Sequence, residues 1–386
     1  MDPQSMHRDL LKFAKAGDWA SVERTARLWL DRQKFYLPHL FLIQALLATG
    51  RDEAADAEFA DLLSYKFNLE DRIRAFPMLE MRYASRFKDH YVLNSMRSEL
   101  SFEAQGSHEV RRWDIPHRLV NEAEFLAQAT VLLDAALGPI GDPLPDDFRG
   151  VVTFGSCFAV NLAKMLNAKG RRAHCLLIEE SINSTFANRL MLQVAAGSID
   201  TPAQRAMFEA CGAAFFDEAR QRLSACSHLV LTVGVAPAFF DTSTSEFVFA
   251  RRYGELLREK KIAMRTTTVA QNVENLRDIL GLLDHLAPHS RKTITVSPVP
   301  LAATAELPSV VLADCVSKST LRAAVHEVLR DRTDVLYFPA FEIVRWLSPY
   351  GTPDVFGASD ANSRHVSDWV VSFIVSEFGR RCIGRS

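Results

Sequence analysis

The stretch from Val151 to Phe154 passes into a helical pattern within three residues, and this junction most constrains how the chain can fold. The four residues are β-branched or aromatic, which is typical of a buried strand. Apolar side chains then recur at helical spacing from Phe158 to Leu166. Gly155-Ser156-Cys157 is therefore a predicted strand-to-helix turn that carries two nucleophilic side chains.

Such a turn is suited to chemistry that develops negative charge. Glycine at position 155 lets the backbone bend sharply, and the first turn of a helix leaves N–H groups unpaired that can bind an anion. The same helix terminus lowers the pKa of a thiol at position 157. Both Ser156 and Cys157 are therefore candidate nucleophiles.

Strand and helix patterns alternate along the rest of this half of the chain. A long amphipathic helix is predicted over 269–287, and a further helix is predicted to begin at Ser317. The alternation predicts an α/β fold with three layers, a parallel sheet with helices on both faces. Active sites in such sheets lie at the carboxyl ends of the strands. The further segments that read as strands are 172–178, 228–234, 293–296 and 334–338.

The N-terminal part has an all-helical pattern. Two helical hairpins are predicted, over 8–30 and 41–63, and their turn glycines are 33 residues apart. This period is close to that of tetratricopeptide (TPR-like) repeats, although the fuller repeat signature is missing. Three prolines between 138 and 145 end the helical pattern. We therefore expect a helical domain over 1–140 and an α/β domain over 148–386. The helical domain either caps the α/β domain or binds a protein partner.

Composition excludes several classes of function. Lys plus Arg (45) nearly balance Asp plus Glu (47), so no net field draws the chain to nucleic acid. No apolar window is long enough for a membrane span, and the first residues lack the pattern of a signal peptide. The six cysteines contain no Cys-x-x-Cys pair, which is typical of reduced thiols. We expect a cytoplasmic protein that recognises its partners through local sites.

Motifs for other chemistries are missing from the sequence. There is no phosphate-binding P-loop, no dinucleotide glycine fingerprint and no His-Glu-x-x-His. His285 and His289 have the spacing of metal ligands on a helix, but Pro288 interrupts that helix and no third ligand is evident. We expect no metal and no required cofactor.

Five blocks follow one another in the second half of the chain. They are Thr153–Ala159, Thr295–Pro300, Ser317–Ser319, Tyr337–Glu342 and a polar segment, Asp360–His365. Their order and number resemble the GSCFA-domain family, a branch of the SGNH/GDSL hydrolase superfamily, over roughly residues 150 to 380. The resemblance implies an SGNH-like α/β fold and an ester hydrolase or acyltransferase with a nucleophile, a histidine and an aspartate.

The resemblance also implies roles for individual residues. When glycine is matched to glycine, Cys157 takes the nucleophile's place in the superfamily's Gly-Asp-Ser turn and Ser156 takes the aspartate's, with Ser156 the rival nucleophile. His365 is the base. The superfamily's usual Asp-x-x-His spacing would place the orienting residue at Asn362, whereas Asp360, the nearest carboxylate, lies five residues before the histidine. Either residue can orient the ring, and we prefer Asp360.

Donors for the tetrahedral oxyanion are less completely matched. Backbone N–H groups after Gly155, together with Gly234, fit the family's arrangement. The asparagine expected two residues after Gly234 is replaced by Ala236. Asn188 or Asn183 can supply a side-chain amide instead, but helix capping or a turn explains either residue equally well.

The substrate follows from the family alone. Related families with a cysteine at this turn imply acyl, especially acetyl, groups of a carbohydrate or polysaccharide precursor, with an acyl-CoA donor as an option. A cytoplasmic location suits a transferase that uses such a thioester. The alternative is a non-catalytic interaction protein with a degenerate site, in which the helical repeat binds a partner.

Overall fold

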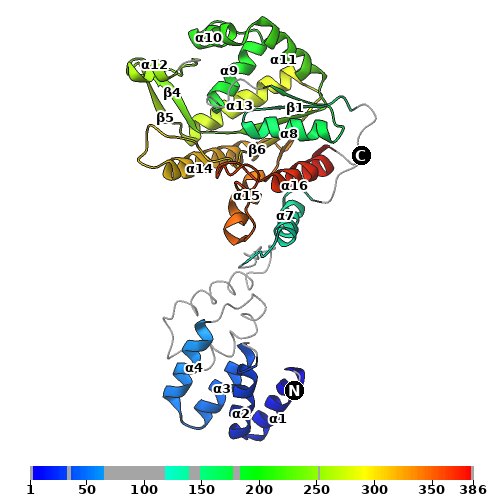
Figure 1. Cartoon of the computed structure of the whole chain (residues 1–386), viewed down its shortest axis with the longest axis vertical. Coiled ribbons are helices and arrows are strands. Elements are labelled where there is room, and N and C mark those ends of the chain that lie inside the picture. The colour runs from blue at the N-terminus through cyan, green and yellow to red at the C-terminus, as the bar shows by residue number, and fades with distance from the viewer. Residues whose placement is uncertain are drawn as a thin grey trace. The chain divides into compact units, whose positions relative to one another are not determined.

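The computed structural model describes residues 3–32, 36–64, 118–138, 148–176, 183–250 and 253–383. The chain divides into two compact units, Met1–Trp113 and Asp114–Ser386 (Figure 1). No helix in the described ranges combines the length and the apolarity that crossing a bilayer requires.

The first unit is helical where it is described, as predicted. Its helices are α1 (Pro3–Ala16), α2 (Trp19–Leu30), α3 (Tyr36–Ala48) and α4 (Asp52–Ser64). Gly17 and Gly50 close the α1–α2 and α3–α4 turns with φ of 70° and 71°, and Leu10, Val22 and Phe59 lie in the shared core. A helical N-terminal region is confirmed, while kinship with TPR repeats stays a prediction.

The second unit is built on a five-stranded sheet in which all neighbouring strands are parallel, as predicted. The order β2-β1-β3-β6-β7 places the second strand on one side of β1 and the later strands on the other. Ligands in open parallel sheets bind at the carboxyl ends of strands where the winding reverses. Here that point lies between β1 and β3. The strands are β1 (Val151–Phe154), β2 (Ala173–Leu176), β3 (His228–Val233), β6 (Arg291–Val296) and β7 (Val335–Tyr337).

Helices cover both faces of this sheet (Figure 1). Alternate residues of the strands point to opposite faces. Leu231 packs with α9, α11, α13 and α14, whereas Val230 packs with α7, α8, α15 and α16. The helices are α7 (Glu122–Leu137), α8 (Cys157–Ala168), α9 (Thr185–Ala195), α10 (Pro202–Cys211), α11 (Ala213–Ala225), α12 (Tyr253–Arg258), α13 (Val269–Leu286), α14 (Val310–Leu329), α15 (Ala340–Leu347) and α16 (Asp368–Phe378), with shorter helical turns at Ser348–Tyr350 and Gly379–Ile383.

Two features differ from the sequence-based expectations. Helix α7 falls in the expected helical domain, yet Phe125 and Leu133 are buried in the α/β core, and the division between the two units falls at 113/114. An antiparallel hairpin, β4 (Pro237–Asp241) and β5 (Ile262–Thr266), also follows β3 without a prediction. The expected boundary segment is only partly described, because residues 139–147 lie outside the described ranges.

A buried histidine begins β3. His228 is 2% exposed, and its Nε2 lies 2.8 Å from the hydroxyl of Thr293. Its ring meets the ring of Phe378 edge-on at 5.6 Å. Burial, assisted by the charge of Arg291, lowers the pKa of His228 to about 3. The imidazole is therefore neutral in the folded chain at neutral pH.

This shift predicts a loss of stability in mild acid. The unfolded histidine takes up a proton below about pH 6.5 and the folded one does not, so His228 lowers the free energy of unfolding by up to about 1.4 kcal/mol per pH unit between pH 6 and pH 4. Urea midpoints measured at pH 7, 6, 5 and 4 should fall less steeply for His228→Gln, which cannot take up that proton. Equal slopes in the two chains would contradict a neutral buried His228.

Candidate active site

The carboxyl end of β1 lies unusually close to β3. Gly155 has φ of 114°, and a Cβ atom built there would lie 2.1 Å from the carbonyl oxygen of Thr232. A side chain at this position would both strain the backbone and collide with β3. Glycine is therefore what allows the turn after β1 to press against β3.

Ser156 is held by β3 through Thr232. The N–H of Ser156 donates to the Thr232 hydroxyl at 2.8 Å, and its own hydroxyl lies 2.7 Å from the same oxygen. The side chain is 4% exposed and makes no capping bond to α8, although it occupies the N-cap position. Ser156 therefore has a defined structural partner, and that partner is not a base.

Cys157 is the first residue of α8, so its backbone belongs to the helix N-terminus. The side chain of Cys157 itself lies outside the described part of the chain.

Gly234 closes the wall between Ser156 and the segment after β2. A Cβ atom at Gly234 would lie 3.1 Å from the Asn183 carbonyl oxygen and 3.2 Å from the Cβ of Ser156. The backbone N–H of Val235 donates to that same carbonyl at 3.3 Å. The end of β1, the segment after β2 and the end of β3 therefore lie together at this point. Ser156 and Gly234 follow β1 and β3, which is where the sequence placed them.

The two candidate asparagines differ in their surroundings. Asn183 is 4% exposed, and its Nδ2 is buried without a hydrogen-bond partner among the described residues. Leaving such a donor unpaired costs about 1–3 kcal/mol. Asn188 instead donates from its amide to the carbonyl of Ser184 at 3.0 Å, within the first turn of α9. The structure thus brings Asn183 to the site, whereas Asn188 supports its own helix.

His365 and Asp360 form a hydrogen-bonded pair. The imidazole Nδ1 donates to Asp360 Oδ2 at 2.5 Å, whereas the amide nitrogen of Asn362 lies 3.4 Å from Nε2. The hydrogen bond from His365 holds the pKa of Asp360 below its ordinary value. The segment from Asp360 to His365 is longer than the usual Asp-x-x-His spacing. Ala361 has φ of 58°, which turns this segment back so that Asp360 reaches the ring. Asp360 is therefore the residue that orients His365 through Nδ1.

One cavity of about 500 Å³ lies beside these elements, and its described lining includes neither His365 nor Asp360. Ser156, Asn183 and Gly234 line one part of it, and Arg364, the neighbour of His365, lines another. Arg364 donates from Nε to the carbonyl of Pro300 at 3.2 Å, which fixes the histidine loop to the loop after β6. The remaining lining residues are Val235, Pro237, Phe239, Tyr253, Met264, Ser297, Val299, Pro300, Leu301, Ala302 and Ala303.

Two buried residues of α14 support the wall of this cavity, and sequence reasoning gave them no role. Lys318 is 2% exposed and donates from Nζ to the carbonyl of Gly234 at 2.7 Å. The hydroxyl of Ser317 accepts from the N–H of Ala236 at 2.9 Å. The available signal was the Ser317–Ser319 block in the sequence.

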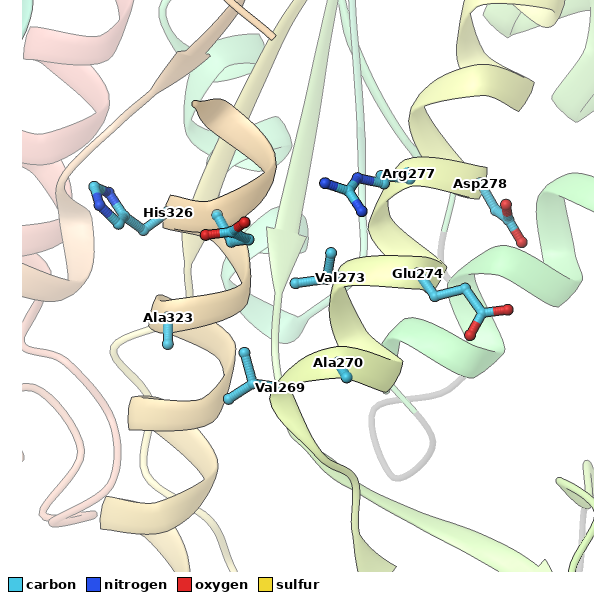
Figure 2. A pocket seen from close by; sticks show the side chains of 9 residues that line it. Val269, Ala270, Val273, Glu274, Arg277, Asp278, Ala323 and His326 are labelled. Atoms are coloured by element: carbon cyan, nitrogen blue, oxygen red, sulfur yellow. The ribbon is translucent and has the colours of Figure 1, made fainter. Parts of the chain in front are cut away.

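A second hollow of about 800 Å³ lies between α13 and α14 (Figure 2). Its lining includes Glu274, Arg277 and His326, and Arg277 pairs with Asp331 at 3.1 Å. It shares no residue with the predicted site, and its described lining includes no serine, threonine or cysteine. Ser156, one of the two candidate nucleophiles, lines the smaller cavity instead.

A group of possible metal ligands lies in the helical unit. Ligand atoms of His39 on α3 and of Glu58 and Asp61 on α4 lie within 4.8 Å of one another. His39 is buried, and its Nδ1 lies 2.5 Å from Glu58 Oε1. This contact joins α3 to α4, so His39 and Glu58 have a structural role as a pair.

Comparison with known proteins adds one positive finding. A family model described as the GSCFA family matches residues 150–378, more than half of the chain. The match includes every residue of the predicted site, from Gly155 to His365. No curated protein matches the chain.

The close approach at Gly155 predicts a large effect of one methyl group. Gly155→Ala should lower the free energy of unfolding by at least about 3 kcal/mol, because the backbone must move away from Thr232. The control is Gly281→Ala in α13, where nothing lies within 4 Å of the added Cβ atom. That change should raise stability by about 0.5–1 kcal/mol. Urea midpoints measure both, and a Gly155→Ala chain as stable as the parent would contradict the packing described.

Proposed function

The chain belongs to the GSCFA family, and we propose that its α/β unit is an SGNH-type enzyme that hydrolyses an ester or transfers an acyl group. The observation that carries the proposal is the His365–Asp360 hydrogen bond, on a loop whose Arg364 lines the same cavity as Ser156. A hydrogen bond from Nδ1 to a carboxylate leaves Nε2 as the nitrogen that exchanges protons with substrate.

Cys157 is the proposed nucleophile. The hydroxyl of Ser156 is engaged with Thr232, and a residue at the first position of α8 has its thiolate stabilised by the helix terminus. His365 takes the thiol proton, and the sulfur attacks the carbonyl carbon of the substrate. A C–S bond forms, and the carbonyl oxygen becomes an oxyanion.

Asn183 is the proposed side-chain donor to that oxyanion. Its buried Nδ2 has no partner among the described residues and lies beside Gly234 in the cavity wall. It thereby replaces the amide missing at Ala236, while backbone N–H groups at the start of α8 supply the other donors. Collapse of the oxyanion breaks the bond to the leaving group, which receives the proton from His365.

The second half of the reaction releases the acyl group. Water or the hydroxyl of an acceptor gives its proton to His365 and attacks the acyl carbon, and the C–S bond to Cys157 breaks. We propose a carbohydrate or polysaccharide precursor as the acceptor or as the acylated substrate, by family resemblance. Acyl-CoA is a suitable donor, because a thiolate leaves readily from a thioester.

Thiol reactivity tests the nucleophile directly. At pH 7, iodoacetamide should label Cys157 at least about tenfold faster than Cys315, an exposed thiol on α14 that serves as an internal control. His365→Ala should remove most of this difference, since the imidazole no longer stabilises the thiolate. Peptide mass spectrometry of timed samples measures both rates.

The same experiment decides against the alternative function. Labelling of Cys157 no faster than that of Cys315 would indicate a degenerate site in an interaction protein. Turnover of p-nitrophenyl acetate adds a second criterion. Cys157→Ala should lower kcat/KM by at least about 10³-fold, whereas Ser156→Ala should keep measurable turnover. The opposite pattern would make Ser156 the nucleophile.

A further inference from the structure

The β4–β5 hairpin forms one wall of the active-site cavity. Ala238 and Phe240 are buried on one face of β4, where Phe240 packs edge-on against Phe186 of α9 at 5.5 Å. The residues that alternate with them point to the opposite face. On that face Phe239 lies opposite Met264 in the strand register, and both line the cavity. The hairpin therefore presents an apolar face to the site.

This apolar face is rigidly held. The ring of Phe239 stacks on that of Tyr253, with centroids 4.1 Å apart and planes 20° from parallel. The Tyr253 hydroxyl accepts from the N–H of Ala250 at 3.2 Å. The wall is thus present before a ligand binds, so a ligand does not have to order it.

The facing wall is the loop from Val299 to Ala303, which is also fixed. The N–H of Leu301 donates to buried Asp314 at 2.9 Å, and Arg345 pairs with the other oxygen of that carboxylate at 2.6 Å. Glu306, farther along the loop, accepts from the N–H and hydroxyl of Thr266 at the end of β5, both at 2.6 Å. Two hydrogen bonds therefore connect the segment after β6 to the end of β5.

The size and polarity of the cavity do not match an acetyl group. Its volume is about 500 Å³, whereas a water molecule takes roughly 30 Å³ of liquid and an acetyl methyl group is of similar size. The polar side chains of Ser156 and Asn183 lie together beside the backbone of Gly234, and Val235 leads from them toward the hairpin. Ser297 and Arg364 are further polar residues of the lining. An acetyl group bound at the polar corner would leave both apolar walls in water.

We infer that the cavity between the β4–β5 hairpin and the 299–303 loop is an acyl-chain pocket for groups of about four to eight carbons. This inference rests on the proposed function. The ester carbonyl binds at the polar corner, and the chain extends over Val235 between Phe239 and Leu301. Each methylene that the walls remove from water raises kcat/KM by about fourfold.

A series of p-nitrophenyl esters tests the chain length. The value of kcat/KM should rise at least tenfold from the acetate (C2) to the hexanoate (C6). Turnover that is equal for C2 and C6, or best for C2, overturns the acyl-chain pocket and leaves the proposed function intact. Absence of turnover and of acylated Cys157 with every ester overturns both.

A pair of matched variants tests the location of the pocket. Ala303 lines the cavity, and Ala303→Phe should lower the C6/C2 ratio of kcat/KM to about one by filling the space for the chain. Ala305, exposed on the same loop and outside the cavity lining, provides the control Ala305→Phe, which should keep the parental ratio. An unchanged ratio in Ala303→Phe, or the same drop in both variants, would overturn the assignment.

Discussion

The site depends on how closely the end of β1 approaches β3. A single missing Cβ at Gly155 permits this approach, since that atom would lie 2.1 Å from the Thr232 carbonyl. Thr232 then fixes Ser156 by two hydrogen bonds, and Ser156 packs against Gly234. The first residue of α8 is thereby placed at the point where the winding of the sheet reverses, which is where a parallel sheet offers a crevice. The fold and the candidate site therefore both depend on the absence of a side chain at position 155.

A second set of contacts extends from α14 to the proposed oxyanion donor. Lys318 donates to the carbonyl of Gly234, and the N–H of the same peptide group, at Val235, donates to the carbonyl of Asn183. Hydrogen bonds in such a chain polarise one another in a low dielectric. Burying an ammonium group is costly unless it is well bonded. The buried ammonium group of Lys318 is bonded to the carbonyl of Gly234. Through this peptide group it helps to hold the backbone of Asn183 in place.

Local patterns in the sequence predicted the parallel sheet, the helices on both faces and the helical N-terminal region, because periodicity reflects local burial. They did not predict the β4–β5 hairpin, whose strands lie in different segments and pair only in the folded chain. The helix expected to begin at Ser317 begins at Val310, so Ser317 and Lys318 are interior residues of α14. Helix α7 was expected in the helical domain, whereas it packs in the α/β core, for a similar reason. Its apolar face indicates that the helix is buried but not which unit it packs against.

The candidate site was also only partly predictable from the sequence. The residue types and the strand-end positions were predictable, and Asp360 was preferred to Asn362 because it is the carboxylate nearest to His365 in the sequence. The different roles of Asn183 and Asn188 were not predictable, since they depend on which amide is bonded to Ser184 within its own helix.

The central claim is that the turn after β1 and the His365–Asp360 loop act on one substrate in one cavity. Its most direct measurement is mass spectrometry of the full chain, acid-quenched milliseconds after mixing with an activated ester at pH 7. The account predicts a single acyl adduct on the peptide that contains Cys157, whereas no adduct, or adducts spread over Cys315 and surface lysines, would contradict it.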